Sequence, residues 1–279
     1  MRAMRYHEYG GPECLRDDVV ERPSPAADEV LVELAATSVN PVDWKLGAGY
    51  AGTIGIPMPF NPGMDFAGVV REIGSGVTGF AVGDRVFGAT LIARSGSYAD
   101  YVTAPAAIVE HVPETIPLGI AAAVPLAALT AWEATRDALH QGVTAGRRVL
   151  VQGGAGGTGI FAVQFAKQYG AHVIATSSAH NHDLLRSLGA DEVVDYGAAR
   201  FEDVVDPVDA VIDLIGDDVA LRSIPLIREG GVLASIARSP DTQAECEALA
   251  GRHGVRLAPY VNISFTRNMP AFAEIARRL

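Results

Sequence analysis

Residues 148–160 read Arg-Val-Leu-Val-Gln-Gly-Gly-Ala-Gly-Gly-Thr-Gly-Ile, and the rest of the chain can be understood by starting from them. The apolar run at 149–151 is typical of a strand that is buried on both faces. Gly154, Gly156 and Gly159 then fit the pattern G-x-G-x-x-G, in which the first glycine permits a tight turn, the second lets the backbone approach a pyrophosphate and the third lets a helix pack against the strand. The stretch therefore predicts a strand, a glycine loop and the start of a helix.

The sequence after the loop favours a phosphate-binding site, although a purely structural turn between two buried elements remains the alternative. Apolar residues from Ile160 to Ala166 recur with helical spacing, the pattern stops at Gly170, and a second strand is predicted at 173–176. In such a βαβ unit the helix N-terminus presents unpaired N–H groups and a favourable dipole to an anion. We therefore expect a dinucleotide to bind at Gly154, Ala155, Gly156, Gly157, Thr158 and Gly159.

The composition sets limits on partners and location. A chain of 279 residues that is 49% hydrophobic can fill two cores, and its net charge of −11 repels the phosphates of nucleic acids and anionic membranes. Cys14 and Cys246 are too few for a disulfide framework and indicate a reducing compartment. Neither a membrane span nor an export signal is recognisable. We expect a cytoplasmic protein without a nucleic-acid or membrane partner.

The pattern of elements changes along the chain. Residues 1–106 contain short apolar segments separated by Gly, Pro and Asp, which predicts mainly β structure, and no helix of convincing length is predicted before Leu118. An alanine-rich helical region follows at 118–139, with a break at Pro125. Strands and helices then alternate, which indicates a parallel doubly wound sheet. The predicted strands are 149–152, 173–176, 192–194, 210–214, 232–236 and 255–260. One predicted helix follows the glycine loop and ends at 169, and three others span 181–188, 219–227 and 242–252.

Several segments, in the same order along the chain, resemble the medium-chain dehydrogenase/reductase superfamily and its zinc-free quinone oxidoreductase branch. They are Ser-Val-Asn-Pro-Val-Asp at 38–43, Pro-Gly-Met-Asp-Phe-Ala-Gly-Val-Val at 62–70, Gly-Asp-Arg-Val-Phe-Gly at 83–88, Leu-Thr-Ala-Trp at 129–132, the glycine loop, and Leu-Gly-Ala-Asp-Glu-Val-Val-Asp-Tyr at 188–196.

The resemblance implies an α/β protein of two domains. A GroES-like, mainly β catalytic domain would span 1–121, and a Rossmann domain with a doubly wound parallel sheet would span 122–262. The C-terminal segment 263–279 looks shortened, because relatives continue beyond the helix expected to begin near Met269. The segment 255–261 resembles the edge strand through which relatives form a homodimer, so a homodimer is expected.

The resemblance also implies that no metal is bound. Asn40 and Met64 stand where zinc-dependent relatives have a cysteine and a histidine ligand, and residues 88–104 contain no cysteine for a structural zinc site. The substrate oxygen would then be polarised by side chains and backbone.

Asn40 and Tyr50 are the residues expected to contact that oxygen, and Thr130 matches a family residue that lies against the nicotinamide. Each has a structural alternative, because Asn40 could be a turn residue before Pro41, Tyr50 a loop aromatic and Thr130 a helix-capping residue.

NADPH is the expected cofactor. The second strand ends Ala-Thr-Ser-Ser at 175–178, and no carboxylate that would repel a 2′-phosphate follows before Asp183. Ser177 and Ser178 can donate to a phosphate and His180 or Arg186 can supply positive charge, although a solvated helix start explains His180 equally well. Tyr196 matches a family tyrosine beside the adenosine.

The function expected from these residues is the NADPH-dependent transfer of hydride to a quinone or an α,β-unsaturated carbonyl compound without zinc. Two alternatives remain open at this point. One is a non-redox biosynthetic enzyme on the same fold, such as a cyclase or an isomerase, and the other is a nucleotide-binding protein without turnover.

Overall fold

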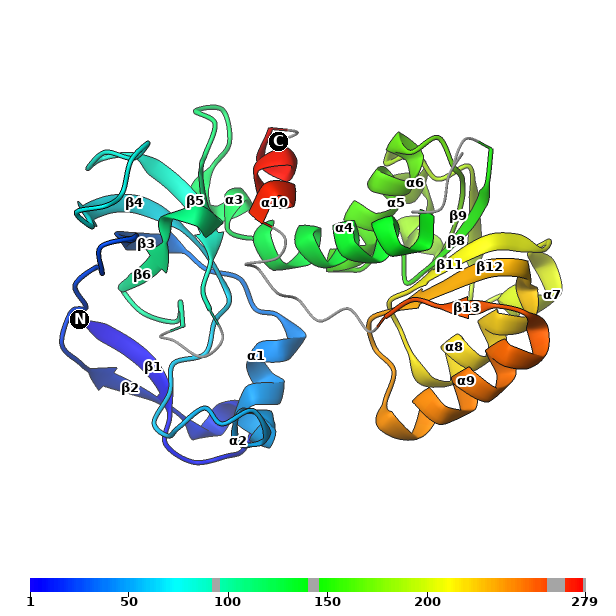
Figure 1. Cartoon of the computed structure of the whole chain (residues 1–279), viewed down its shortest axis with the longest axis horizontal. Coiled ribbons are helices and arrows are strands. Elements are labelled where there is room, and N and C mark those ends of the chain that lie inside the picture. The colour runs from blue at the N-terminus through cyan, green and yellow to red at the C-terminus, as the bar shows by residue number, and fades with distance from the viewer. Residues whose placement is uncertain (92–95, 140–145, 260–268, 278–279) are drawn as a thin grey trace. The chain divides into compact units, whose positions relative to one another are not determined.

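A computed structural model describes residues 1–91, 96–139, 146–259 and 269–277, and these residues form two compact units (Figure 1). The first unit holds residues 1–129 and the C-terminal helix, and the second begins at Thr130 and ends with the last strand of the parallel sheet. The division lies inside helix α4 (Pro125–Leu139). The domain limits 121/122 and 262/263 expected from the sequence stay a prediction.

The first unit is built on an antiparallel sheet, as the mainly β pattern predicts. Its strand order is β6-β3-β4-β5-β7, and β1 and β2 form a separate antiparallel pair. Buried valines on β3, β4, β5 and β6 form the core together with Phe66, because β-branched side chains pack well on a pleated surface. The strands are β1 (Arg2–Tyr6), β2 (Leu15–Val19), β3 (Glu29–Ala36), β4 (Asp65–Ile73), β5 (Arg85–Ala89), β6 (Tyr101–Pro105) and β7 (Val109–His111).

After Asn40 the structure has three short helical segments that the sequence does not predict. They are α1 (Pro41–Lys45), the π-helical turn η2 (Leu46–Tyr50) and α2 (Ala51–Thr53). Each is shorter than the window over which helical spacing can be recognised. Proline at the first position and the Asp43 carboxylate, which accepts the Asn40 backbone N–H at 2.8 Å, define where α1 begins. The helical region predicted at 118–139 is confirmed as α3 (Leu118–Ala121) and α4, which begins at Pro125.

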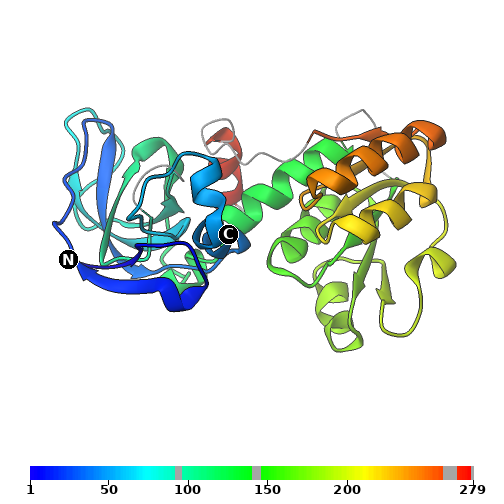
Figure 2. The same ribbon diagram turned by 90° about the horizontal axis from the view of Figure 1, so that it is seen from below.

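The second unit is a six-stranded parallel sheet with the order β10-β9-β8-β11-β12-β13. This is the doubly wound Rossmann arrangement predicted from the alternation of elements, and the predicted fold class is confirmed. Helices α5 and α6 cover one face and α8 and α9 the other (Figure 1), and Figure 2 looks onto the face that carries α8 and α9. The strands are β8 (Arg148–Gln152), β9 (His172–Ser177), β10 (Glu192–Asp195), β11 (Val208–Asp213), β12 (Ile227–Ser235) and β13 (Arg256–Leu257), and the helices are α5 (Gly157–Gln168), α6 (His182–Ser187), α7 (Phe201–Val204), α8 (Asp217–Ser223) and α9 (Pro240–His253).

Three details of this sheet differ from the prediction. The four-residue helix α7 is too short to predict, and the helix expected at 219–227 ends at Ser223, where the 3₁₀ turn Ile224–Leu226 contains Pro225. Strand β12 therefore begins earlier than expected. Strand β13 covers only two of the residues expected at 255–260, since Pro259 cannot donate a ladder hydrogen bond, and Tyr260 lies outside the described residues.

The C-terminal helix α10 (Met269–Ala276) belongs to the first unit. Phe272 is buried there, and its ring centroid lies 5.1 Å from that of Phe87 on β5. Part of the predicted C-terminal segment 263–279 thus completes the core of the first unit. Within the described residues, no helix has the length and apolar character needed to cross a membrane.

Candidate functional site

The glycine loop begins directly after β8, and its turn is made by Gly153. This residue has a φ of 74°, in the left-handed region that favours glycine. Gly154 lies inside the same turn, which a hydrogen bond from the Gly156 N–H to the Gly153 carbonyl oxygen closes (3.0 Å). A side chain at 154 would also be crowded, because a Cβ on it would lie 2.9 Å from the Ala175 Cβ on the neighbouring strand β9.

The other glycines open the N-terminus of α5 as predicted. A Cβ on Gly159 would lie only 2.2 Å from the Gly153 carbonyl oxygen, so no side chain fits where the first turn of α5 crosses the end of β8. Gly156 is the N-cap residue and has no side chain that could cap the helix. The first intrahelical bond recorded runs from the Ile160 N–H to the Gly156 oxygen (3.1 Å), so the N–H groups of 157–159 have no partner within the helix. This cradle fits a phosphate group.

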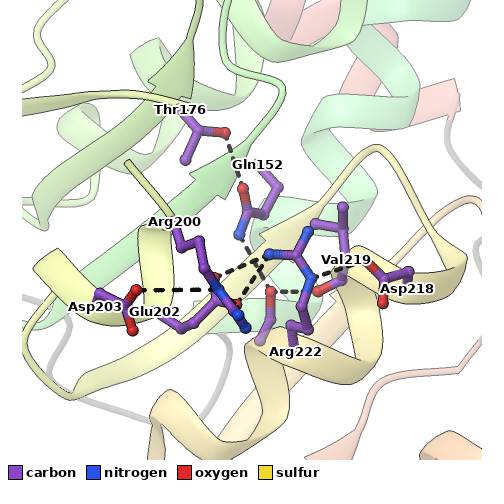
Figure 3. A network of polar contacts seen from close by, with 9 residues as sticks. Gln152, Thr176, Arg200, Glu202, Asp203, Asp218, Val219 and Arg222 are labelled. Carbon is purple, nitrogen blue, oxygen red and sulfur yellow. Dashed lines mark hydrogen bonds and ion pairs between the residues drawn. The ribbon is translucent and has the colours of Figure 1, made fainter. Parts of the chain in front are cut away.

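A chain of hydrogen bonds connects the glycine loop to β9 and α8, and Figure 3 shows the part of it that runs from Thr176 through Gln152 to Val219. The Gly153 N–H donates to Thr176 Oγ1 (3.0 Å), and the Thr176 hydroxyl donates to Gln152 Oε1 (2.8 Å). Gln152 Nε2 in turn donates to Ser223 Oγ (3.2 Å), whose hydroxyl donates to the Val219 carbonyl oxygen at 2.7 Å. Each donor in this series of hydrogen bonds has one acceptor, so the turn of the loop is connected to both β9 and α8.

Ion pairs extend this network to the surface. Arg222, next to Ser223, pairs with Glu202 on α7 (2.9 Å) and Asp218 on α8 (2.8 Å), and Arg200 also pairs with Glu202 (Figure 3). Burial alone would raise the pKa of Glu202, but hydrogen bonds from its backbone, Arg200 and Arg222 outweigh burial and lower the pKa to about 2. Sequence reasoning missed this network and the buried chain; polar residues at the ends of predicted buried strands, such as Gln152 and Thr176, were the available signal.

The residues expected around a 2′-phosphate lie at the end of β9. Ser178 Oγ lies 3.2 Å from His180 Nδ1, and the Tyr196 backbone N–H donates to the Ser177 oxygen (3.4 Å). Ser177 is buried and its hydroxyl donates to the Ser178 carbonyl oxygen, whereas Ser178 is half-buried and the Tyr196 side chain is 63% exposed. Ser178 and His180 are therefore better placed than Ser177 to meet a ligand.

The first unit places Asn40 beside a buried carboxylate, Asp65, at the start of β4. Asn40 Nδ2 donates to Asp65 Oδ2 (2.8 Å) and to Ser38 Oγ (3.0 Å), and the Ser38 hydroxyl donates to the same Asp65 oxygen at 2.5 Å. The other oxygen, Asp65 Oδ1, accepts the Leu126 backbone N–H in the first turn of α4 (2.8 Å). Sequence reasoning singled out Asn40 but not Asp65 or Ser38, although all three lie in segments that carry the family resemblance.

Burial dominates the electrostatics of this region. It raises the pKa of Asp65 to about 6, against the opposing effect of hydrogen bonds from Ser38, Asn40 and the Leu126 backbone. Burial also raises the pKa of Asp43, against hydrogen bonds from the Asn40 backbone, Tyr98 and the Gly63 backbone. The pKa of the Tyr98 phenol is raised by burial and by Asp43, to whose carboxylate it donates a hydrogen bond of 3.2 Å.

The remaining predicted residues are separate from these groups. Tyr50 ends η2 with its side chain 48% exposed, and it has no recorded hydrogen bond to Asn40 among the described residues. Thr130 is buried in α4 and belongs to the second unit. The structure thus brings together Asn40, Ser38 and Asp65 in one unit, and the glycine loop, Ser178 and His180 in the other. Among the residues that the structure describes, no group of three His, Cys, Asp or Glu side chains could hold a metal ion.

Comparison with known proteins identifies the family. Residues 26–114 match the alcohol dehydrogenase GroES-like domain, and residues 157–268 match the zinc-binding dehydrogenase model. Over 251 residues the chain is 36% identical to a chloroplast envelope quinone oxidoreductase homolog of Arabidopsis thaliana, covering 86% of this chain and 76% of the relative. The chain belongs to the quinone oxidoreductase branch of the medium-chain dehydrogenase/reductase superfamily. The predicted resemblance to this superfamily and branch is confirmed, whereas the absence of zinc stays a prediction.

Other members of the superfamily show the same likeness. A 2-methylene-furan-3-one reductase of Solanum lycopersicum is 38% identical over 240 residues, which are 83% of this chain but only 61% of that reductase, so the chain spans about three fifths of its length. The solved quinone oxidoreductase of Coxiella burnetii has a TM-score of 0.83 and 32% identity, and the match covers 99% of this chain and 88% of the Coxiella chain. A mycobacterial protein solved in complex with NADPH has a TM-score of 0.80 and 30% identity, and the match covers 100% of this chain and 87% of the mycobacterial chain.

We predict that Gly159→Ala disrupts the cradle and that Gly157→Ala does not. A Cβ at 159 meets the Gly153 backbone oxygen at 2.2 Å, which should cost about 1–3 kcal/mol of unfolding free energy, whereas a Cβ at 157 meets nothing within 4 Å. Urea unfolding measures the stability of both variants, and fluorescence titration measures NADPH binding. Equal stability of the two variants would contradict the close packing of α5 on β8.

Proposed function

We propose that this protein is an NADPH-dependent reductase that delivers hydride to a quinone or an α,β-unsaturated carbonyl compound without zinc. The observation that carries the proposal is the glycine cradle at the end of β8, where a Cβ on Gly159 would lie 2.2 Å from backbone and the first turn of α5 offers N–H groups to a phosphate. The names of relatives support the substrate class, since they include a quinone oxidoreductase homolog and an NADPH-dependent alkenal/one oxidoreductase.

The chemistry divides between cofactor and chain. Bound NADPH would supply the hydride. The N-terminus of α5 would bind the pyrophosphate, Ser178 and His180 would meet the 2′-phosphate, and Thr130 would lie against the nicotinamide. Asn40 and Tyr50 would orient the substrate oxygen. Zinc independence rests on Asn40 and Met64, neither of which supplies a ligand of the cysteine or histidine type.

The central prediction is NADPH consumption with 9,10-phenanthrenequinone by protein that contains no stoichiometric zinc. Asn40→Ala should lower the turnover by about ten- to a thousandfold if the amide stabilises developing negative charge, while NADPH binding stays nearly unchanged. Loss of absorbance at the NADPH band and elemental analysis are the measurements.

Two outcomes would favour the rival functions. Binding of NADPH without consumption by any quinone or enone would indicate a nucleotide-binding protein, and conversion of a substrate without net NADPH consumption would indicate a cyclase or an isomerase. One tightly held zinc ion per chain would contradict the zinc-independent mechanism.

A preference for NADPH over NADH is predicted from the end of β9. Ser178→Asp should weaken NADPH binding at least tenfold, about 1.4 kcal/mol, because its carboxylate would repel the 2′-phosphate, and should change NADH binding little. Ser187→Asp, on the exposed side of α6, adds the same charge as a control. Dissociation constants of both cofactors, measured at pH 6 and at pH 8, should show tighter binding of NADPH than of NADH. Tighter NADH binding at both pH values would refute the assignment.

We also propose a homodimer that forms through β13, in a cytoplasmic setting where the free thiols of Cys14 and Cys246 remain reduced. Strand β13 ends the sheet, and such an edge is a natural site for pairing with a second copy. Leu257→Lys should convert the dimer to a monomer, whereas Val194→Lys on β10, at the opposite edge and equally half-buried, should leave it intact. Light scattering that shows a monomer of the unmodified protein at micromolar concentration would exclude this assembly.

A further inference from the structure

A buried carboxylate and a half-buried hydroxyl share a short hydrogen bond in the first unit. Ser38 Oγ lies 2.5 Å from Asp65 Oδ2, and the serine stands between two exposed neighbours, Thr37 and Val39, in the loop before α1. Asp65 itself has no exposed surface. Its other recorded donors are amide N–H groups, which do not exchange protons as a hydroxyl does. The Ser38 hydroxyl therefore connects this carboxyl group to the exposed loop.

The contact between Ser38 and Asp65 is compatible with two arrangements of the hydrogens. While Asp65 is ionised, the Ser38 hydroxyl donates to Oδ2. A proton on Asp65 belongs on Oδ2, because Oδ1 accepts the Leu126 backbone N–H at 2.8 Å. Ser38 Oγ then accepts the carboxyl proton, and its own hydrogen turns away from Asp65. No heavy atom has to move, and the hydrogen that has turned away is available to a ligand.

Asn40 places the proposed substrate oxygen near this hydroxyl. The capping box at the start of α1 directs the Asn40 side-chain oxygen to the Asp43 backbone N–H, and Nδ2 faces Asp65 Oδ2 (2.8 Å) and Ser38 Oγ (3.0 Å). Because these two acceptors are only 2.5 Å apart, one amide hydrogen serves both and the second remains for the substrate. A substrate oxygen about 2.9 Å from Nδ2 lies at most about 6 Å from Ser38 Oγ, a gap that one water molecule can bridge.

Reduction of a quinone or an enone consumes a proton as well as a hydride, because hydride addition leaves negative charge on the substrate oxygen. We propose that the Ser38 hydroxyl donates this proton and that Asp65 replaces it. The Ser38 O–H bond breaks as an O–H bond forms on the substrate side, and the Asp65 proton passes to Ser38 Oγ, which leaves Asp65 ionised. After the product leaves, Asp65 regains a proton from water through Ser38. This inference deepens the proposed function and rests on it.

The groups around Asp65 suit a proton donor. The titratable groups on this face are Asp43, from α1, whose negative charge disfavours ionisation of Asp65, and the Tyr98 phenol. The first turn of α4 presents a backbone N–H, and among the described residues no lysine, arginine or histidine forms an ion pair with Asp65. Burial without a cation raises the pKa of Asp65 to about 6, and a general acid is most effective when its pKa lies near the operating pH.

The first test requires neither cofactor nor turnover. Carbon-13 NMR of the aspartate carboxyl groups should show one group, assigned by its loss in Asp65→Asn, that titrates near pH 6. Ser38→Ala removes a donor that favours the ionised carboxylate, so the midpoint should rise. Ser97→Ala is the matched control, because Ser97 is buried nearby but its hydroxyl contacts Thr37 Oγ1. A carboxyl group that stays ionised below pH 5, or a midpoint that Ser38→Ala leaves unchanged, would overturn the proposal.

The second test uses the rate. The kcat/KM for 9,10-phenanthrenequinone should fall about tenfold between pH 5 and pH 7, following the protonated fraction of a group that titrates near pH 6. Ser38→Ala should lower kcat about a hundredfold, the usual contribution of a general acid, with NADPH binding unchanged. Ser38→Thr keeps the hydroxyl and should restore most of the rate.

A rate that does not depend on pH, or a Ser38→Ala variant as active as Ser97→Ala, would exclude Ser38 as the proton donor. If Asp65→Asn does not fold, the carboxyl group is identified by the response of its midpoint to Ser38→Ala. If no quinone or enone is reduced, the proposed function fails, and the NMR midpoints alone then decide whether Ser38 and Asp65 share a proton.

Discussion

The close crossing of α5 over the end of β8 is the constraint on which the second unit depends. Only glycine fits at 159, because any Cβ there would penetrate the Gly153 carbonyl oxygen. Gly153 itself has a left-handed backbone conformation, and its N–H donates to Thr176 Oγ1 on the neighbouring strand. Hydrogen bonds continue from Thr176 through Gln152 to α8.

In both units, buried polar groups next to the candidate site are hydrogen-bonded by uncharged partners. Beside the glycine loop, a chain of hydroxyl and amide groups gives each of its side-chain polar atoms a hydrogen-bond partner without using a charged side chain. Around Asp65, a hydroxyl, an amide and a backbone N–H surround a carboxylate that has no ion pair among the described residues. Uncharged donors keep the carboxylate buried but leave it close to its protonated form, which a guanidinium partner would prevent.

Long, regular features could be predicted from the sequence, and short or three-dimensional ones could not. The alternation after residue 148 predicts the parallel sheet because each buried strand and each helical stripe extends over a recognisable window. The helices α1, α2 and α7 are too short to leave such a pattern. Gly153 was missed because a motif gives the residue types of a turn but not which of two adjacent glycines adopts the left-handed conformation. The carboxylate of Asp65 was missed for another reason, since Ser38 and Asp65 are far apart in sequence and only the pairing of β3 with β4 brings their surroundings together.

The contact between Phe272 and Phe87 has a consequence for the order in which the chain can fold. The second unit is continuous in sequence from Thr130 to the last strand of its sheet, so its core can close as soon as β13 has been synthesised. The first unit begins first but lacks α10 until the second unit has been synthesised, and Phe272 is one of its most buried side chains. A nascent chain therefore carries an exposed apolar face around Phe87 throughout the synthesis of the Rossmann unit. The first unit begins earlier in the sequence, but its hydrophobic core is completed later.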